Sequence, residues 1–194
     1  MGWSGDYWLS ISIIVICGSI LTILLIERRS LKKMAYEDAM TGLLNRNALN
    51  QFIHTQKGND PVAVLFLDLD QFKDINDRLG HHVGDLLIQE VGNRLRMFMD
   101  PSLHVFRIGG DEFLMIAKHY DQQQAELLAE QVLHSIRHVY DIDGHDLRVS
   151  GSIGICIGTT QDDPLMLLKK ADSAMYKAKQ RGKNQFALFK ERLD

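Results

Sequence analysis

The segment HVFRIGGDEFLMIA, residues 104–117, decides the architecture of this chain. Two apolar runs, His104–Ile108 and Glu112–Ala117, flank the tripeptide Gly109-Gly110-Asp111. Apolar runs on either side of two glycines predict a β-hairpin, because glycine readily adopts the positive φ of a tight turn. The tip of this hairpin carries two adjacent carboxylates and backbone N–H groups that an anion can approach closely.

A second acidic pair follows another apolar segment. The run Val62–Leu67 is short and rich in β-formers, which predicts a buried strand, and it leads into Asp68-Leu69-Asp70. Carboxylates at a strand end are good Mg²⁺ ligands, and palm-type nucleotidyl transferases hold metal ions with acids from two adjacent strand ends. The alternative is structural: aspartate also forms caps and turns, and a glycine-rich hairpin needs no ligand.

Three further groups of polar residues have two interpretations each. Lys179 and Lys183 are four residues apart near a helix end, so we expect them to share a face, where they would contact phosphates or complement the helix C-terminus. Asn76 and Asp85 would together bind a purine edge. The alternative is that these two residues, and His81 between them, cap turns and helix starts.

The remaining pattern predicts a mixed α+β domain. The predicted helices are residues 45–54 with Asn45 as the N-cap, 83–99, 122–139 and 164–181; the predicted strands are 62–67, 104–108, 112–117, 147–157 and 185–189. Strands and helices alternate, but the hairpin makes at least one pairing antiparallel.

The N-terminal part predicts a membrane anchor. Tyr7–Ile26 contains no charged residue, and a helix of that length spans about 30 Å, the thickness of a bilayer core. Aromatic residues, Trp3 among them, precede or open the run, and four basic residues follow it, which predicts a short external segment 1–6 and a cytoplasmic C-terminal part. Residues 27–39 are expected to continue the helix as a stalk. A cleaved signal peptide and a buried core helix are the alternatives.

Composition limits the classes of protein. The chain has 194 residues, with 22 Lys and Arg against 25 Asp and Glu, which suits one domain with an appendage and excludes a disordered tail. The net charge of −3 provides no strong basic field, so nucleic acid is not expected as a partner. Two distant cysteines, Cys17 and Cys156, favour a reducing compartment.

Five motifs in order resemble the GGDEF family of diguanylate cyclases, here as a membrane-anchored member. They are DAMTGLLNR (38–46), DLDQFKDIND (68–77), GHHVGD (80–85), RIGGDEF (107–113) and ADSAMYKAKQRGKN (171–184). The resemblance implies a catalytic domain over residues 36–194, with a fold like the adenylyl-cyclase and polymerase palm: a largely antiparallel sheet flanked by helices. It also implies that a homodimer condenses two GTP into cyclic di-GMP and releases two pyrophosphates.

The resemblance also implies roles for individual residues. Asp68, Asp111 and the Leu69 carbonyl would bind Mg²⁺, with Mn²⁺ as an alternative ion. Asp111 or Glu112 would assist deprotonation of the 3′-OH. The expected substrate-binding residues are Lys73, Asn76, His81, Asp85, Gly109, Gly110, Lys179 and Lys183. Of these, Asn76 and Asp85 would bind guanine, His81 would lie beside the substrate, and the lysines would neutralise phosphates.

The chain departs from the family pattern at three places. Met40 replaces a leucine, and Lys183 replaces the more usual arginine, which keeps the charge but loses the bidentate fork. Many family members carry an R-x-x-D motif that binds the product, whereas the corresponding positions here are Asp100 and Leu103. We therefore expect that cyclic di-GMP does not inhibit through this primary site.

Two other functional hypotheses remain open at this stage. The chain could be a catalytically silent GTP-binding signalling module, although it has lost none of the signature residues. It could also be the GGDEF portion of a longer membrane protein with an EAL phosphodiesterase domain. In the leading hypothesis the protein crosses the bacterial inner membrane once and keeps its catalytic domain in the cytoplasm.

Overall fold

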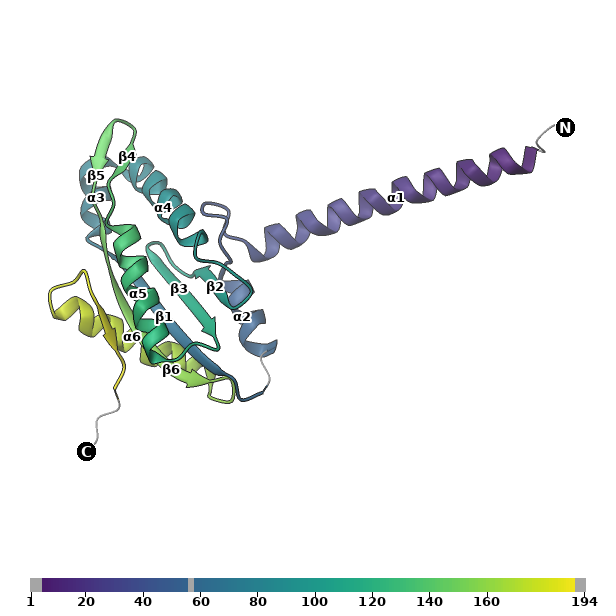
Figure 1. Ribbon diagram of the computed structural model, residues 1–194. Coiled ribbons are helices and arrows are strands. Elements are labelled where there is room, and N and C mark those ends of the chain that lie inside the picture. Colours follow the sequence, from purple (N-terminus) through teal and green to yellow (C-terminus); the bar gives the residue numbers. More distant parts are fainter. Residues whose placement is uncertain (1–4, 56–57, 191–194) are drawn as a thin grey trace.

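The computed structural model describes residues 5–55 and 58–190 (Figure 1). The helices are α1 Gly5–Tyr36, α2 Arg46–Thr55, α3 Phe72–Leu79, α4 His81–Arg96, α5 Gln122–Ile136 and α6 Pro164–Gln180. The strands are β1 Pro61–Asp70, β2 Leu103–Arg107, β3 Glu112–Lys118, β4 Tyr140–Ile142, β5 His145–Leu147, β6 Ser150–Thr159 and β7 Phe186–Leu188.

The main sheet has five strands in the order β2-β3-β1-β6-β7. Every pairing in it is antiparallel except that of β6 with β7, which is parallel. The predicted α+β class with a largely antiparallel sheet is therefore confirmed. A separate hairpin joins β4 and β5.

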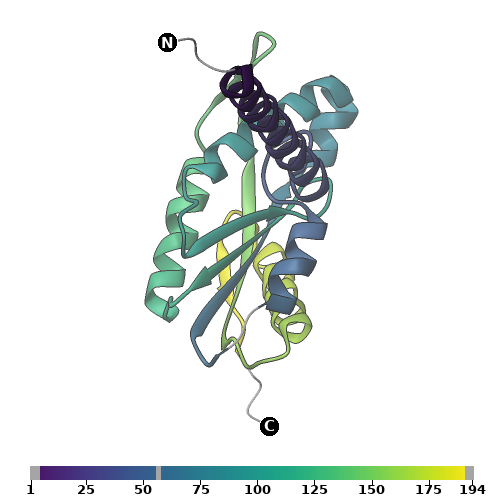
Figure 2. The ribbon, with the colours of Figure 1, turned by 90° about the vertical axis from the view of Figure 1, so that its right-hand side faces the viewer.

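Helices cover both faces of this sheet, which explains why β1 is apolar on both sides. Ala63, Leu65 and Leu67 point into a cluster that includes residues of α4 and α5. Val62 and Val64 belong to a second cluster with residues of α2 and α6. Figure 2 shows α5 on one side of the sheet and α2 with α6 on the other.

The predicted helices and strands of this domain are all present, with ends shifted by a few residues. Sequence analysis missed α3 and the β4–β5 hairpin. Helix α3 has only eight residues, and its apolar residues Phe72, Ile75 and Leu79 are spaced on one helical face and pack partly buried against the core. This spacing is a helix signal, but it covers only about two turns. The hairpin turn is Asp143-Gly144, both with positive φ, and this dipeptide is a hairpin signal that went unused.

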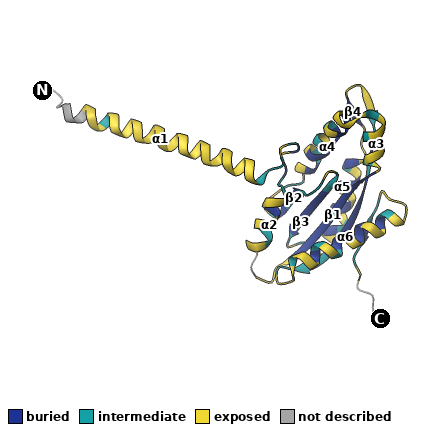
Figure 3. Cartoon of the chain, turned by 180° about the vertical axis from the view of Figure 1, so that it is seen from behind, coloured by how far each residue is buried: buried dark blue, intermediate teal, exposed yellow. Residues whose placement is uncertain are grey.

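Helix α1 projects away from the domain and is exposed along almost its whole described length (Figure 3). It is the one described helix long and apolar enough to cross a membrane, with a mean hydropathy of 2.8 in its most apolar window. The helix continues without a break to Tyr36, three residues short of the end of the predicted stalk at residue 39. Trp3 and most of the predicted external segment 1–6 lie outside the described residues.

Strand β6 packs directly on helix α6 at Gly154. A Cβ atom at Gly154 would overlap the Ala171 carbonyl and the Met175 amide, which are backbone groups of α6. The same face of β6 carries Gly158, where an added Cβ would meet only the side chains of Leu167 and Asp162. Backbone groups cannot move aside without shifting the helix, whereas side chains can rotate.

Replacing Gly154 by alanine should therefore lower the free energy of unfolding by about 3 kcal/mol. The matched change Gly158→Ala should cost about 1 kcal/mol or less, because its neighbours can rotate. Urea unfolding of the full chain in detergent, followed by far-UV circular dichroism, measures both. Equal effects of the two substitutions would contradict this account of the β6–α6 contact.

Candidate active site

Pairing of β1 with β3 brings the two acidic motifs together. Asp68 lies opposite Glu112 in the antiparallel register, and the Leu69 amide donates to the Asp111 carbonyl at 3.2 Å. The carboxylates of Asp68, Asp111 and Glu112 therefore gather at one end of the sheet, as predicted for adjacent strand ends. We call these three residues the acidic edge. Asp68 is the most enclosed of the three, with 8% of its surface exposed.

Lysine 179 provides the positive charge at this acidic edge. Its Nζ forms an ion pair with Asp68 Oδ1 at 2.6 Å. Burial raises the pKa of Asp68, the lysine opposes that rise, and the negative charges of Asp111 and Glu112 add to it. The edge therefore has an excess of negative charge that favours a further cation.

The donor set at this edge suits Mg²⁺ or Mn²⁺ only in part. Among the described residues, no group of three or more His, Cys, Asp and Glu side chains is arranged to hold a metal ion. Two carboxylates with a backbone carbonyl are nevertheless hard oxygen donors, and Mg²⁺ is commonly bound by one or two carboxylates together with substrate phosphates. Asp68, Asp111 and the Leu69 carbonyl fit an ion that is shared with a nucleotide.

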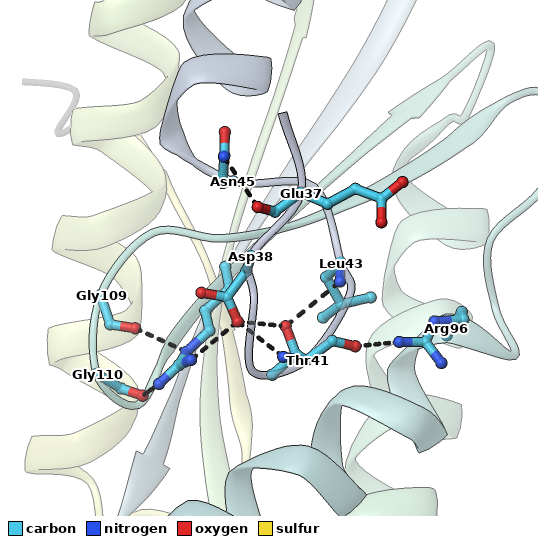
Figure 4. Close-up of polar contacts among 9 residues, drawn as sticks. Glu37, Asp38, Thr41, Leu43, Asn45, Arg96, Gly109 and Gly110 are labelled. Carbon is cyan, nitrogen blue, oxygen red and sulfur yellow. Dashed lines mark hydrogen bonds and ion pairs between the residues drawn. The ribbon is translucent and has the colours of Figure 1, made fainter. Parts of the chain in front are cut away.

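Arg107 stabilises the turn that carries Asp111, and its partners Gly109, Gly110 and Asp38 are labelled in Figure 4. Its Nε donates to the Gly109 carbonyl at 3.2 Å, and its Nη2 donates to the Gly110 carbonyl at 2.9 Å. Its Nη1 donates to Asp38 Oδ1, also at 2.9 Å. One guanidinium thus joins both turn glycines to the segment that follows α1.

The Asp38 carboxylate is itself held in place by its neighbours. Asp38 Oδ1 also accepts from the Thr41 amide at 2.9 Å and from the Thr41 hydroxyl at 2.7 Å. Burial alone would raise the pKa of Asp38, but hydrogen bonds from Arg107 and Thr41 outweigh it and hold the pKa below its usual value. The carboxylate is therefore a stable anionic acceptor for Arg107.

Two more side chains attach the end of α1 to the domain. Asn45 donates through Nδ2 to the carbonyls of Ala35 and Glu37, and its Oδ1 accepts from the amides that open α2. Arg96, in the last turn of α4, donates to the Thr41 carbonyl. Figure 4 shows the contacts of Asn45 with Glu37 and of Arg96 with Thr41 in the loop between α1 and α2.

The predicted guanine-binding residues lie on α3 and α4. Asn76 Oδ1 is buried and has no hydrogen-bond partner among the described residues. A Cβ atom at Gly84 would overlap the Asn76 side chain, so glycine leaves the room that this amide needs. His81 and Asp85 are exposed at the start of α4, and Lys73 is exposed in the first turn of α3.

The expectation that Lys179 and Lys183 share a helix face is wrong. Helix α6 ends at Gln180, and Lys183 lies in the following loop with φ +64°. The Lys183 amide donates to the Ala178 carbonyl at 3.2 Å, which turns the chain back across the helix end. Only Lys179 contacts the acidic edge through an ion pair in the described structure.

Sequence analysis missed the role of Asp70. This buried carboxylate accepts from the hydroxyls of Ser150 and Ser152 at 2.6 and 2.7 Å, and from the Asn184 amide at 3.0 Å. It therefore joins β1, β6 and the loop after α6. Its partners are at least 80 residues away in sequence, so no local pattern indicates them.

Comparison with known proteins identifies the family of this site. Residues 35–185 match the family described as the diguanylate cyclase GGDEF domain. The chain belongs to the GGDEF family. The two motifs that form the acidic edge, and the α3 and α4 residues beside it, all lie within the matched segment.

Several curated relatives are much longer than this chain. It is 35% identical to the bifunctional diguanylate cyclase/cyclic di-GMP phosphodiesterase MucR of Pseudomonas aeruginosa, over 96% of this chain and 31% of that protein. It is 33% identical to the diguanylate cyclase DosC of Escherichia coli K12, over 80% of this chain and 35% of that protein. The chain thus spans about a third or less of the curated relatives that it matches.

Solved structures agree with the observed fold. The GGDEF domain of PA1120 (TpbB or YfiN) from P. aeruginosa superposes with a TM-score of 0.72 at 32% identity, covering 80% of this chain and 95% of that one. The coiled coil and GGDEF domain of DgcB from Caulobacter crescentus, solved with c-di-GMP, gives 0.82 at 21% identity, over 91% and 97% of the two chains. The second likeness supports the fold alone.

A double-mutant cycle tests the contact of Asp38 with Arg107. The alanine variants at these positions, alone and combined, should give a coupling free energy of unfolding of about 1.5–3 kcal/mol, because the charged hydrogen bond is largely shielded from water. The control pair is Lys33 and Glu37, which are 3.7 Å apart and more exposed. Its coupling should be about 0.5 kcal/mol or less, and equal couplings for the two pairs would refute the proposed difference.

Proposed function

We propose that this chain is a diguanylate cyclase that condenses two GTP molecules into cyclic di-GMP with release of two pyrophosphates. The observation that carries the proposal is the gathering of Asp68, Asp111 and Glu112 at one strand edge beside Lys179. Family membership supports the same reaction, because the chain retains every residue of the RIGGDEF signature.

The residues at the acidic edge would position and neutralise the reacting groups. Asp68, Asp111 and the Leu69 carbonyl would hold Mg²⁺, or alternatively Mn²⁺, which would neutralise charge on the phosphates. Asp111 or Glu112 would accept the proton of the attacking 3′-OH. Phosphoryl transfer depends mainly on such positioning and charge neutralisation.

Phosphate and base would be bound on either side of this edge. Gly109 and Gly110 leave the turn accessible to a phosphate, and Lys73, Lys179 and Lys183 would balance its charge. The unpartnered Asn76 amide supports a base site between α3 and α4. Asp85 would accept from the N1–H and N2–H₂ groups of guanine, with His81 beside the substrate.

The reaction requires two copies of the chain, because each active site would hold one GTP whose 3′-OH attacks the α-phosphate of the other. Helix α1 supports a parallel homodimer. Leu31 and Met34 are 59% and 76% exposed, and they extend the heptad positions of Ile20 and Leu24, with the charged Glu27 at the position between Leu24 and Leu31. This spacing is that of a coiled-coil seam.

We further propose that the protein spans the bacterial inner membrane once. Residues 7–26 would be the transmembrane helix, 27–39 the stalk and 36–194 the cytoplasmic catalytic domain, with residues 1–6 outside. The exposed apolar surface of α1 supports this arrangement, because exposing so large an apolar surface to water is unfavourable. Arg28, Arg29, Lys32 and Lys33 follow the span and favour the cytoplasmic side.

The full chain in detergent micelles, supplied with GTP and Mg²⁺, should form cyclic di-GMP that mass spectrometry detects. Asp111→Ala should lower the rate by about 10²-fold or more. The control Asp141→Ala removes an exposed carboxylate from β4 and should leave the rate unchanged. A wild-type chain that binds GTP as a dimer but forms no product would instead support the silent binding module.

The contacts of the loop before β2 support the proposal that this chain lacks the primary product-inhibition site. Asp100 accepts from the Ser102 amide and hydroxyl and from the Leu103 amide, so its carboxylate is used within the turn. Leu103 is only 2% exposed and belongs to the core. Neither residue is placed to supply the cation and the carboxylate of an R-x-x-D motif.

Added cyclic di-GMP should therefore not slow the initial rate through this loop. The measurement is the initial rate against product concentration, for the wild type and for Asp100→Ala. Inhibition that disappears in the Asp100→Ala variant would show that the loop binds product after all.

A further inference from the structure

A polar hollow of about 460 Å³ lies beside the acidic edge, between α3, the start of β6 and the loop after α6. Its basic lining comes from three separate parts of the chain: Arg78 of α3, Arg137 at the end of α5 and Arg148 before β6. Ser150 and Asn184 add polar groups, and no aromatic side chain lines it. Three arginines thus line one space.

The positive charge of this hollow is not balanced by ion pairs. In the part of the chain that the structure describes, no carboxylate lies within ion-pair distance of any of the three arginines. Arg137 makes one long hydrogen bond, to the Asn184 carbonyl at 3.4 Å. The guanidinium donors are therefore largely available to a ligand.

Two carboxylates, Asp70 and Asp74, also line the hollow and offset part of its positive charge. Asp70 is buried and already accepts three hydrogen bonds, from Ser150, Ser152 and the Asn184 amide. Asp74 is exposed, and its side chain accepts from Gln71 Nε2 at 3.5 Å. The formal charge of the lining is +1, from three arginines and two aspartates.

We propose that this hollow is an anion subsite that binds pyrophosphate. Arginine recognises phosphate oxygens with two parallel hydrogen bonds, which a hollow with three guanidiniums can repeat on both phosphates of a small polyanion. The lack of an aromatic platform disfavours a nucleoside. None of Lys73, Lys179 and Lys183 lines the hollow, so it is separate from the lysines assigned to GTP.

The position of the subsite gives it a role that rests on the proposed function. Asn184 lines the hollow and follows Lys183 directly, and Asp70 and Gln71 line it two and three residues after Asp68. Pyrophosphate released at the acidic edge would reach these arginines without crossing the domain. The subsite would therefore receive the leaving group and separate it from the product nucleotide.

Equilibrium dialysis of the full chain in detergent, with radiolabelled pyrophosphate and no GTP, tests the site directly. The background variant Lys73→Gln/Lys179→Gln/Lys183→Gln removes the three lysines assigned to the phosphates of GTP, and saturable binding should remain. Adding Arg137→Gln and Arg148→Gln should weaken that binding at least about tenfold, the loss of roughly 1.4 kcal/mol. Adding Arg29→Gln instead, an exposed stalk arginine, should leave it unchanged.

Absence of saturable binding in the lysine background, or equal binding with and without the two arginines, would overturn the subsite. Circular dichroism of each variant establishes that it is folded, and the exposed positions of all three arginines favour this. The dialysis requires no turnover. A chain that binds pyrophosphate here but forms no cyclic di-GMP would therefore contradict the proposed function and leave the subsite intact.

Discussion

The Arg107 guanidinium joins the signature turn to the rest of the protein. It donates to the carbonyls of Gly109 and Gly110 on one side and to the Asp38 carboxylate on the other. A turn with two glycines has little conformational preference of its own, so these hydrogen bonds fix the conformation of the turn. Helix α1 ends at Tyr36, two residues before Asp38, so the same contact connects α1 to the acidic edge.

Opposing charges organise the acidic edge itself. Asp68 is buried among other carboxylates, and its raised pKa reflects burial first and the neighbouring negative charges after it. Lys179 offsets part of this negative charge. The Asp70 carboxylate is instead stabilised by hydrogen bonds from two serine hydroxyls. Asp68 and Asp70, separated by one residue, thus have different roles. Asp68 belongs to the acidic edge, and Asp70 joins β1, β6 and the loop after α6.

Much of the fold was predictable because its signals are local. The apolar run of β1 and the glycines of the hairpin are visible in sequence, and the two acidic motifs could be paired once both were read as strand ends. The motifs GHHVGD and DAMTGLLNR pointed to the family, although the structural task of Asp38 was not recognised. Its partner Arg107 is 69 residues away, and only the folded chain brings the two together.

The errors have equally specific causes. Helix α3 has only eight residues, so the helical spacing of Phe72, Ile75 and Leu79 extends over just about two turns and is easily overlooked. Lys179 and Lys183 are four residues apart, a helical spacing, but α6 ends at Gln180, so Lys183 lies in the following loop and not on the helix face. The arginine-lined hollow was not predicted, since its three guanidiniums come from parts of the chain separated by up to 70 residues.

Amide hydrogen exchange in the signature turn is the most direct test of the central claim, that the segment after α1 holds this turn through Arg107. Asp38→Asn retains the size of the side chain and removes its charge. The account predicts faster exchange at the amides of residues 109–112 in this variant, while the amides of β6 remain unchanged. Equal exchange in the turn of both proteins would show that Asp38 does not hold it and would contradict the account.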